Sequence, residues 1–244
     1  MGSAAFLEPA AATAPSNAFP PSTRKQSTAA VWRPSAQESS VHLARWQPSG
    51  LPVAVVRGAR LLHASGISQA ISAGACDAVF AAMEIARSSG ALITYDPNLR
   101  LKLWPLTRAR AVILASLAVC DWCLPSQDDA TLLFPDMAPE AVVDACHRAG
   151  ARGVVLKRGA AGCLVSDGKR CEAIAAHRVT PVDATGAGDC FDGAFAARLI
   201  AGDDPFAAAR YANAAAALAT TGFGAVAPLP RVQDVERLLT MAAA

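Results

Sequence analysis

The feature that most constrains how this chain can fold is a glycine turn at the start of a helix-like run. In residues 181–195, Gly186 and Gly188 bracket Ala187, and Asp189 follows before an Ala/Phe-rich stretch. Glycine adopts backbone conformations that larger residues avoid, and it lets an anion approach main-chain amides closely. The first amides of a helix lack intrahelical acceptors, so they can bind a phosphate. Asp189 would then lie beside a phosphoryl group, as a base for an attacking hydroxyl.

The same residues have a simpler interpretation. Gly-x-Gly-Asp also fits a surface loop that ends in an Asp helix cap, and caps of this kind are common. The turn alone leaves both interpretations open, so the rest of the chain has to separate them.

From about Leu51 onward, the chain alternates between strand-like and helix-like segments. Residues 60–64, 91–95, 121–124 and 153–157 read as strands, and the segments between them have helical spacing, one starting at the cap residue Ser72 and ending at Gly90. Residues 162–166 and 170–174 predict an antiparallel hairpin, and three helices are expected near 189–200, 205–219 and 230–239. This order predicts an α/β fold with a largely parallel sheet between helical layers and ligands at the carboxyl ends of the strands.

Composition narrows the class of protein and its partners. Of 244 residues, 53% are hydrophobic and 17% are charged, which indicates a well-filled globular core. The near-balance of 22 basic and 20 acidic residues argues against nucleic acid as a partner. No apolar run approaches the roughly 18 residues that span a bilayer, and the start does not resemble a signal peptide, so we expect a cytoplasmic protein. The seven cysteines fit reduced, buried thiols.

Residues 1–50 differ from the remainder. They hold six of the sixteen prolines and long Ala/Ser/Thr stretches, without helical or strand periodicity. We expect this low-complexity segment to be disordered or poorly packed, and the folded domain to cover residues 51–244.

The spacing of Asp183, Thr185, Gly186, Gly188 and Asp189 resembles the signature of the PfkB, or ribokinase-like, sugar kinases. The resemblance implies a three-layer α/β/α sandwich and phosphoryl transfer from ATP with Mg²⁺. In it, the amides of the turn from Gly186 through Ala187 and Gly188 hold the phosphate, Asp189 is the catalytic base, and Asp183 contacts the sugar.

A second segment runs from Asp96 to Trp104 and reads Asp-Pro-Asn-Leu-Arg-Leu-Lys-Leu-Trp. It resembles the Asp-x-Asn-x-Arg segment of 2-keto-3-deoxygluconate kinases. The resemblance implies that Arg100 meets both the acid end of the substrate and the nucleotide phosphate, with Asn98 beside it. From chemistry alone, a surface loop stapled by an Asp–Arg pair explains the segment equally well.

Three weaker matches concern the nucleotide. Ser126 to Asp129 resembles the family's Asn-x-x-Glu segment, which implies a magnesium role for Asp129, although a helix cap explains the same residues. Residues 155–162 resemble the segment that borders ATP, which implies nucleotide contacts by Lys157 and by the backbone of Gly159 and Gly162. Residues 211–218 resemble the helix beside the adenine, which places Asn213 there.

One further match concerns a cation. Residues 222–228 match a turn that, with the Asp183 region, can bind a monovalent cation such as K⁺ in relatives.

The resemblance also has limits. Nothing in residues 1–50 resembles the family's first strands or the small β lid that closes over the sugar. His63 is interpreted as a core residue.

The favoured hypothesis is a shortened kinase that converts 2-keto-3-deoxygluconate and ATP to the 6-phosphate and ADP. A remnant that binds nucleotide without turnover, and a kinase for fructose or ribose, are the alternatives. Neither nucleic acid nor a membrane is expected as a partner, and a homo-oligomer is left open.

Overall fold

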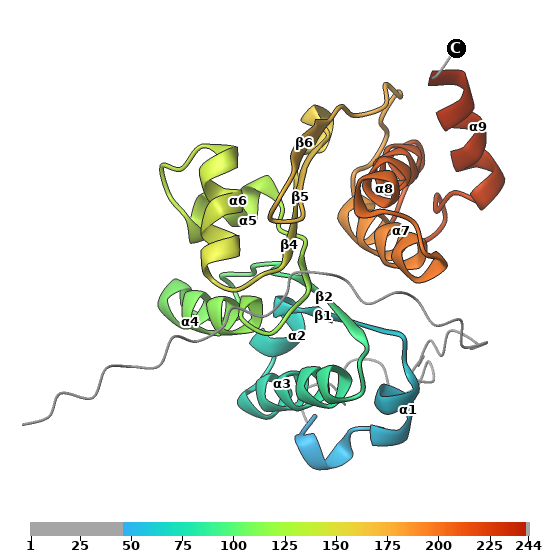
Figure 1. The fold of residues 1–244 in the computed structure, drawn as a ribbon. Helices are drawn as coiled ribbons and strands as arrows, with labels where there is room; N and C mark the ends of the chain where they lie inside the picture. The colour runs from blue at the N-terminus through green and yellow to red at the C-terminus, as the bar shows by residue number, and fades with distance from the viewer. Residues whose placement is uncertain (1–45, 243–244) are drawn as a thin grey trace, which may run out of the picture.

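The computed structural model describes residues 46–242 and has a single six-stranded sheet within them (Figure 1). The strands lie side by side in chain order, and the first four are parallel while the last two are antiparallel. They are β1 (Leu61–Ser65), β2 (Leu92–Asp96), β3 (Trp122–Cys123), β4 (Gly153–Lys157), β5 (Cys163–Ser166) and β6 (Cys171–Ile174). The largely parallel sheet and the predicted hairpin are both confirmed.

Helices cover both faces of this sheet, as Figure 1 shows. One core contains residues of α3, α4, α5 and α6 together with one face of the strands, and a second core joins the opposite face to α7 and α8. The helices are α1 (Val53–Gly58), α2 (Gly66–Ala70), α3 (Ala73–Ser88), α4 (Leu106–Leu117), α5 (Gln127–Leu133), α6 (Pro139–Arg148), α7 (Ala187–Ala201), α8 (Pro205–Ala219) and α9 (Val232–Ala242), with 3₁₀ turns η2 (Pro48–Gly50) and η3 (Gly159–Ala161). The three-layer sandwich is therefore confirmed.

Local sequence signals explain where the longer helices begin and end. The Ser72 hydroxyl accepts a hydrogen bond from the Ala75 amide, so it caps α3 as predicted. Gly90 follows that helix with a positive φ of 75°, a conformation that suits glycine. Asp204 caps α8 by accepting from the Phe206 amide. The short helices α1 and α2 were not predicted, because five or six residues are too few to show helical periodicity.

The core on the α7 side contacts the sheet through an aromatic pair. On the α7 side, Phe195 packs edge-to-face against Trp122 of β3, with ring centroids 5.2 Å apart. This contact seats the middle of α7 against the sheet. The ion pair between Asp192, near the start of α7, and Lys157, the last residue of β4, places the amino end of the helix at the carboxyl ends of the parallel strands, where ligands bind in folds of this class.

The beginning of the described chain packs against α3, a helix that contacts β1 and β2. Pro48–Gly50 form η2, which lies against α3, and among the described strands β1 pairs only with β2. The predicted low-complexity segment otherwise lies outside the described residues, so the boundary at residue 50 stays a prediction. No helix found between residues 46 and 242 combines the length and apolar character needed to cross a bilayer.

Candidate active site

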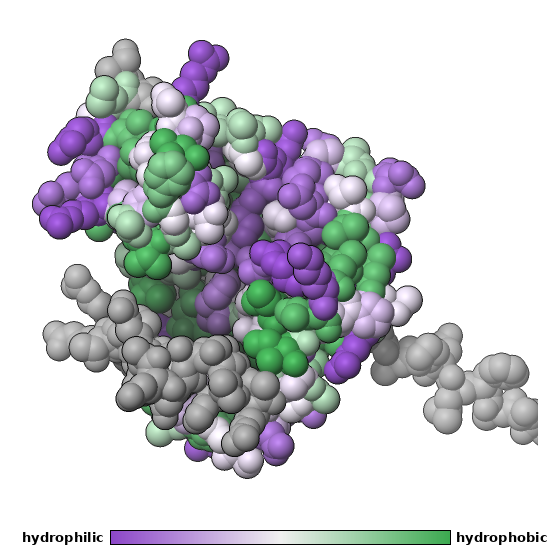
Figure 2. Space-filling model, turned by 180° about the vertical axis from the view of Figure 1, so that it is seen from behind, coloured by the Kyte–Doolittle hydropathy of each residue, from purple (hydrophilic) through white to green (hydrophobic). Residues whose placement is uncertain are grey.

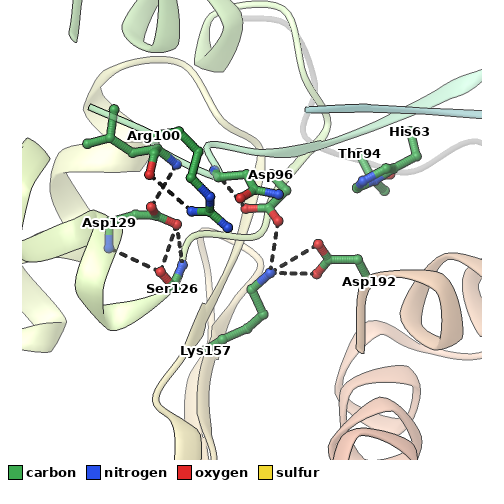
Figure 3. A network of polar contacts seen from close by, with 10 residues as sticks. His63, Thr94, Asp96, Arg100, Ser126, Asp129, Lys157 and Asp192 are labelled. Atoms are coloured by element: carbon green, nitrogen blue, oxygen red, sulfur yellow. Dashed lines mark hydrogen bonds and ion pairs between the residues drawn. The ribbon is translucent and has the colours of Figure 1, made fainter. Parts of the chain in front are cut away.

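Polar residues from three distant parts of the chain meet at the carboxyl edge of the sheet. Asp96 is the last residue of β2, Lys157 is the last residue of β4, and Asp192 comes from α7 (Figure 3). A space-filling view shows the molecule hollowed between the part that holds α7–α9 and the part that holds α4–α6, with hydrophilic residues along much of the hollow (Figure 2). The network of Asp96, Lys157 and Asp192 lies at the carboxyl ends of the strands, where a fold of this class is expected to bind its ligands.

The glycine turn has the conformation that its sequence requires at Gly186. This residue is the N-cap of α7 and has φ 77° and ψ 0°, in the left-handed region. A Cβ at Gly186 would lie 2.7 Å from the Cβ of Ala225, which is closer than side chains can approach. Gly188 differs, because it is a helical residue of α7 without a positive φ. Because Gly188 has no side chain, it leaves the backbone amides at the start of α7 accessible.

Asp189 is the exposed acid at this helix end. It lies in the first turn of α7, and no hydrogen bond or ion pair engages its carboxylate within residues 46–242. An acid locked into an internal ion pair could not accept a proton from a substrate. The position and exposure of Asp189 therefore fit the predicted catalytic base.

Three buried charges form a network behind the turn. The Lys157 ammonium donates to Asp192 Oδ1 and Oδ2 at 2.9 and 3.0 Å and to Asp96 Oδ2 at 3.3 Å. Burial alone would lower the pKa of Lys157, but Asp192 and Asp96 outweigh it and raise that pKa above its usual value. Burial raises the pKa of Asp192, and Lys157 opposes that shift. Lys157 thus remains a cation that two carboxylates hold in place.

The loop after β2 is organised by its own acid. The Asn98 amide donates to Asp96 Oδ1 at 3.0 Å, and Asn98 takes a positive φ of 36°. Arg100 is exposed, and its Nη1 donates to the Leu99 carbonyl at 3.0 Å. No carboxylate pairs with Arg100 among the described residues, so the Asp–Arg staple is absent there. The planar guanidinium of Arg100 is therefore available to bind an anion through two N–H groups.

Asp129 forms a complete capping box for α5. Its Oδ2 accepts from the Ser126 hydroxyl at 2.7 Å, and its Oδ1 accepts from the Leu99 amide at 2.8 Å (Figure 3). No cluster of three or more His, Cys, Asp or Glu side chains suited to a metal occurs in the described part of the chain. Because Mg²⁺ usually keeps several waters and binds substrate phosphates, Asp129 can still order such a water. Its magnesium role stays a prediction.

A cavity of about 660 Å³ adjoins the glycine turn. Gly159, Asn213 and Ala187 line it, so it brings two predicted nucleotide residues to the turn. Its volume suits a drug-sized ligand. The Asn213 side chain donates to the Ala175 carbonyl at 2.7 Å, which makes it a fixed part of the wall.

Two other predicted nucleotide residues lie elsewhere. A Cβ at Gly162 would lie 1.9 Å from the Ile174 carbonyl oxygen, so the hairpin itself demands glycine there. Lys157 points into the acid network instead of lining this cavity. The nucleotide roles of both residues stay predictions.

Asp183 ties two loops together. Its Oδ1 accepts from the Thr185 amide and hydroxyl at 2.9 and 2.7 Å, and its Oδ2 accepts from the Gly224 amide at 2.9 Å. The Thr185 hydroxyl and the Gly224 amide lower the pKa of Asp183. These bonds hold the glycine turn to residues 222–228. A sugar would have to share these oxygens, so the substrate role of Asp183 stays a prediction, as does the cation site.

His63 is a residue whose position the sequence pattern did not reveal. It is exposed on β1, and its Nδ1 lies 2.9 Å from Thr94 Oγ1 (Figure 3). Although part of its surface is open to solvent, the ring is surrounded by protein, and this partial loss of solvent lowers the pKa of His63, while Asp96 opposes that shift. The interpretation of His63 as a core residue is therefore wrong. No sequence signal marked this position, because Leu61 and Leu62 precede His63 without alternation of apolar and polar residues; in the structure its neighbour Ala64 is the buried residue.

Comparison with known proteins agrees with this geometry. The sequence model of the pfkB family carbohydrate kinases matches residues 22–232. The chain belongs to the pfkB carbohydrate kinase family. The match begins within the segment that composition set apart, ahead of the predicted domain boundary.

Fructokinases are among the curated pfkB relatives. Fructokinase-2 of Zea mays is 33% identical over 79% of this chain and 60% of its own length, and Fructokinase-2 of Oryza sativa subsp. japonica is 33% identical over 78% and 59%. The chain thus spans about 60% of the length of these relatives.

Solved pfkB-type structures share the fold. An E. coli protein named Ribokinase II, in complex with ATP and Mg²⁺, matches with a TM-score of 0.74 and 29% identity over 81% of this chain and 64% of its own. A fructokinase from Vibrio cholerae O395, with fructose, ADP and calcium bound, matches with a TM-score of 0.68 and 28% identity over 73% and 60%. The ribokinase-like architecture is therefore established.

Proposed function

We propose that this pfkB-family chain transfers the terminal phosphoryl group of ATP to a hydroxyl of a free sugar. The observation that carries the proposal is the exposed, unpaired Asp189 carboxylate at the amino end of α7, next to the left-handed Gly186 turn. The cavity that Ala187, Gly159 and Asn213 line supplies room for a nucleotide beside that turn.

The chain's residues divide the work in this proposal. The amides of Gly188 and Asp189 stand at the second and third positions of α7, where a helix offers them no acceptor, so they bind a phosphate oxygen. Asp189 accepts the proton of the attacking hydroxyl. Because a carboxylate is a much weaker base than an alkoxide, proton transfer runs late, as the bond to phosphorus forms.

Mg²⁺ fits the water-ordering position of Asp129. When bound, this ion neutralises charge on the phosphates. Asp129 would hold one of its waters in addition to the hydrogen bonds that it accepts from Ser126 and Leu99, and Arg100 would bind a phosphate oxygen. A monovalent cation beside Asp183 remains part of the proposal, and a change of turnover when K⁺ replaces Na⁺ would support it.

Fructose is the substrate that the relatives favour. The curated proteins cited above are fructokinases, and one solved neighbour contains fructose. This supports a neutral sugar over the 2-keto-3-deoxygluconate that the Asp96–Trp104 segment suggested.

The sugar acid remains a second candidate because of one observation. The Arg100 guanidinium is exposed and has no carboxylate partner among the described residues, which suits a substrate carboxylate. The two substrates predict different results for Arg100→Gln. A selective loss of kcat/KM for 2-keto-3-deoxygluconate indicates a carboxylate contact, whereas an equal loss for fructose and the acid indicates a phosphate contact.

The decisive experiment is an ADP-release assay on the purified chain with fructose, ribose and 2-keto-3-deoxygluconate. Sugar-dependent ADP formation that Asp189→Asn abolishes supports the proposal and identifies the substrate. ATP binding without turnover on any sugar would contradict it. That result would favour a nucleotide-binding remnant, an alternative that the partial length of the chain keeps open.

A further inference from the structure

We propose that Lys157 is a positioning residue that fixes the first turns of α7, and thereby Asp189, against the carboxyl edge of the sheet. Lys157 does so through hydrogen bonds to its two partners, Asp96 and Asp192 (Figure 3). The inference rests on the proposed function, because it concerns how the proposed base is held. It replaces the direct nucleotide contact that the sequence predicts for Lys157.

The first argument is that the carboxylates of Asp96 and Asp192 already engage the N–H donors of Lys157. An ammonium group has three N–H donors, and Lys157 Nζ makes three contacts, two to Asp192 at 2.9 and 3.0 Å and one to Asp96 at 3.3 Å. The three side chains are 12%, 3% and 7% exposed for Lys157, Asp192 and Asp96. No donor is left over for a phosphate, and little of the group faces solvent.

The second argument is where the network attaches to α7. Asp192 follows Asp189 by three residues, so the two positions are neighbours on the helix surface, about one turn apart. The aromatic contact of Phe195 with Trp122 holds the middle of the helix, whereas the ion pair holds the end that carries the free amides. A Cβ at Gly188 would lie 3.7 Å from Lys157 Nζ, which places the ammonium directly behind the glycine turn.

The third argument is the cost of disrupting the network. Removing Lys157 would leave Asp96 and Asp192 buried without their counter-ion, and removing the Asp192 carboxylate would take away the ion pair that ties α7 to β4. Because Lys157 and Asp96 are strand residues held within the sheet, we expect the loss of that pair to act on the start of α7.

Asp192→Asn separates positioning from direct nucleotide binding. If Lys157 positions α7, this variant lowers kcat at least tenfold, while KM for ATP stays within about threefold. Hydrogen–deuterium exchange of residues 184–192 also becomes faster. If Lys157 binds the nucleotide directly, Asp192→Asn frees the lysine and keeps kcat, whereas Lys157→Met raises KM for ATP at least tenfold. The second pattern overturns the inference.

The matched control is Asp121→Asn at the opposite, amino edge of the sheet. Asp121 is also buried, accepts from the Ile93 amide at 2.8 Å and pairs with Arg152 Nη1 at 3.0 Å. Its loss is expected to lower the melting temperature comparably, without changing kcat or exchange in residues 184–192. Equal kinetic losses in both variants would mean a general stability effect and would overturn the inference.

Two further outcomes, a wild-type chain without turnover and a variant that does not fold, can be distinguished from a failure of the inference. If the wild-type chain shows no turnover, the proposed function fails, and exchange of residues 184–192 still tests the positioning role. If Asp192→Asn does not fold, the double variant Lys157→Met/Asp192→Asn removes opposite charges together. Faster exchange and low kcat in the double variant support the inference, and wild-type values overturn it.

Discussion

Asp189 and Asp192 lie one turn apart on α7 in opposite surroundings. Asp189 is exposed and unpaired within the described residues, while Asp192 is buried and held by two hydrogen bonds from Lys157. The same side chain therefore supplies a free base at one position and an anchor at the other. Of these two acids, Asp189 is therefore the one whose exposure suits the proposed role of proton acceptor.

Asp189→Asn is expected to lower sugar-dependent ADP formation by about 10²- to 10⁴-fold, because an amide cannot accept the hydroxyl proton. Stability should stay within about 0.5 kcal/mol, since the side chain is exposed. A coupled assay and thermal unfolding measure the two effects. Asp77→Asn, an exposed acid on α3, is the control that should leave both unchanged. Turnover that survives in Asp189→Asn would remove the base from the mechanism.

Gly186→Ala is expected to destabilise the fold by at least about 1–2 kcal/mol, the cost of a left-handed conformation for a residue with a Cβ. The φ of 77° and the 2.7 Å approach to the Ala225 Cβ both oppose the new methyl group. Denaturant unfolding measures the change.

Gly193→Ala is the matched control for that substitution. Gly193 lies inside α7 with nothing within 4 Å of a new Cβ, so alanine should stabilise the chain by about 0.5–1 kcal/mol through helix propensity. Equal effects of the two alanines would show that the turn tolerates a side chain.

Gly188→Ala tests access to the amides separately from folding. The new Cβ would meet only Lys157 Nζ, at 3.7 Å, and the residue is already helical, so stability should be kept or rise by up to about 1 kcal/mol. The methyl group would crowd the phosphate at the helix start, and the dissociation constant for ATP should rise at least tenfold. Calorimetric titration measures it, with Gly193→Ala as the reference. Unchanged affinity would mean that the phosphate does not approach over Gly188.

Local sequence patterns account for the parts of the fold that were predicted. The Ser72 cap, the Gly90 helix end and the strand that ends at Lys157 depend on neighbouring residues, so a single sequence displays them. The Ser126 and Asp129 capping box is also local, and the helix-cap interpretation was one of the two predicted for them.

Long-range pairs account for what the sequence did not reveal. Lys157 and Asp192 are 35 positions apart, and Lys157 and Asp96 are 61 apart, so only the folded sheet brings them together. A motif match assigns Lys157 to the nucleotide because it compares residue types alone. Which acids accept hydrogen bonds from Lys157 depends on the fold, which places Asp96 and Asp192 next to it. The exposure of His63 likewise depends on which face of β1 is covered.

The cysteines offer a test of the fold that does not depend on turnover. Burial raises the pKa of Cys163 to about 12, so at pH 8 only about one thiol in 10,000 would be the reactive thiolate. Cys171 is exposed and Cys190 is half-buried beside Asp189, while the other five are buried. A thiol reagent should therefore modify Cys171 quickly and Cys190 more slowly, and the rest only after unfolding. Mass spectrometry of labelled peptides identifies the sites, with Cys171→Ser as the control that removes the fast phase. Rapid labelling of Cys163 in the native chain would contradict the packing of β5 between β4 and β6.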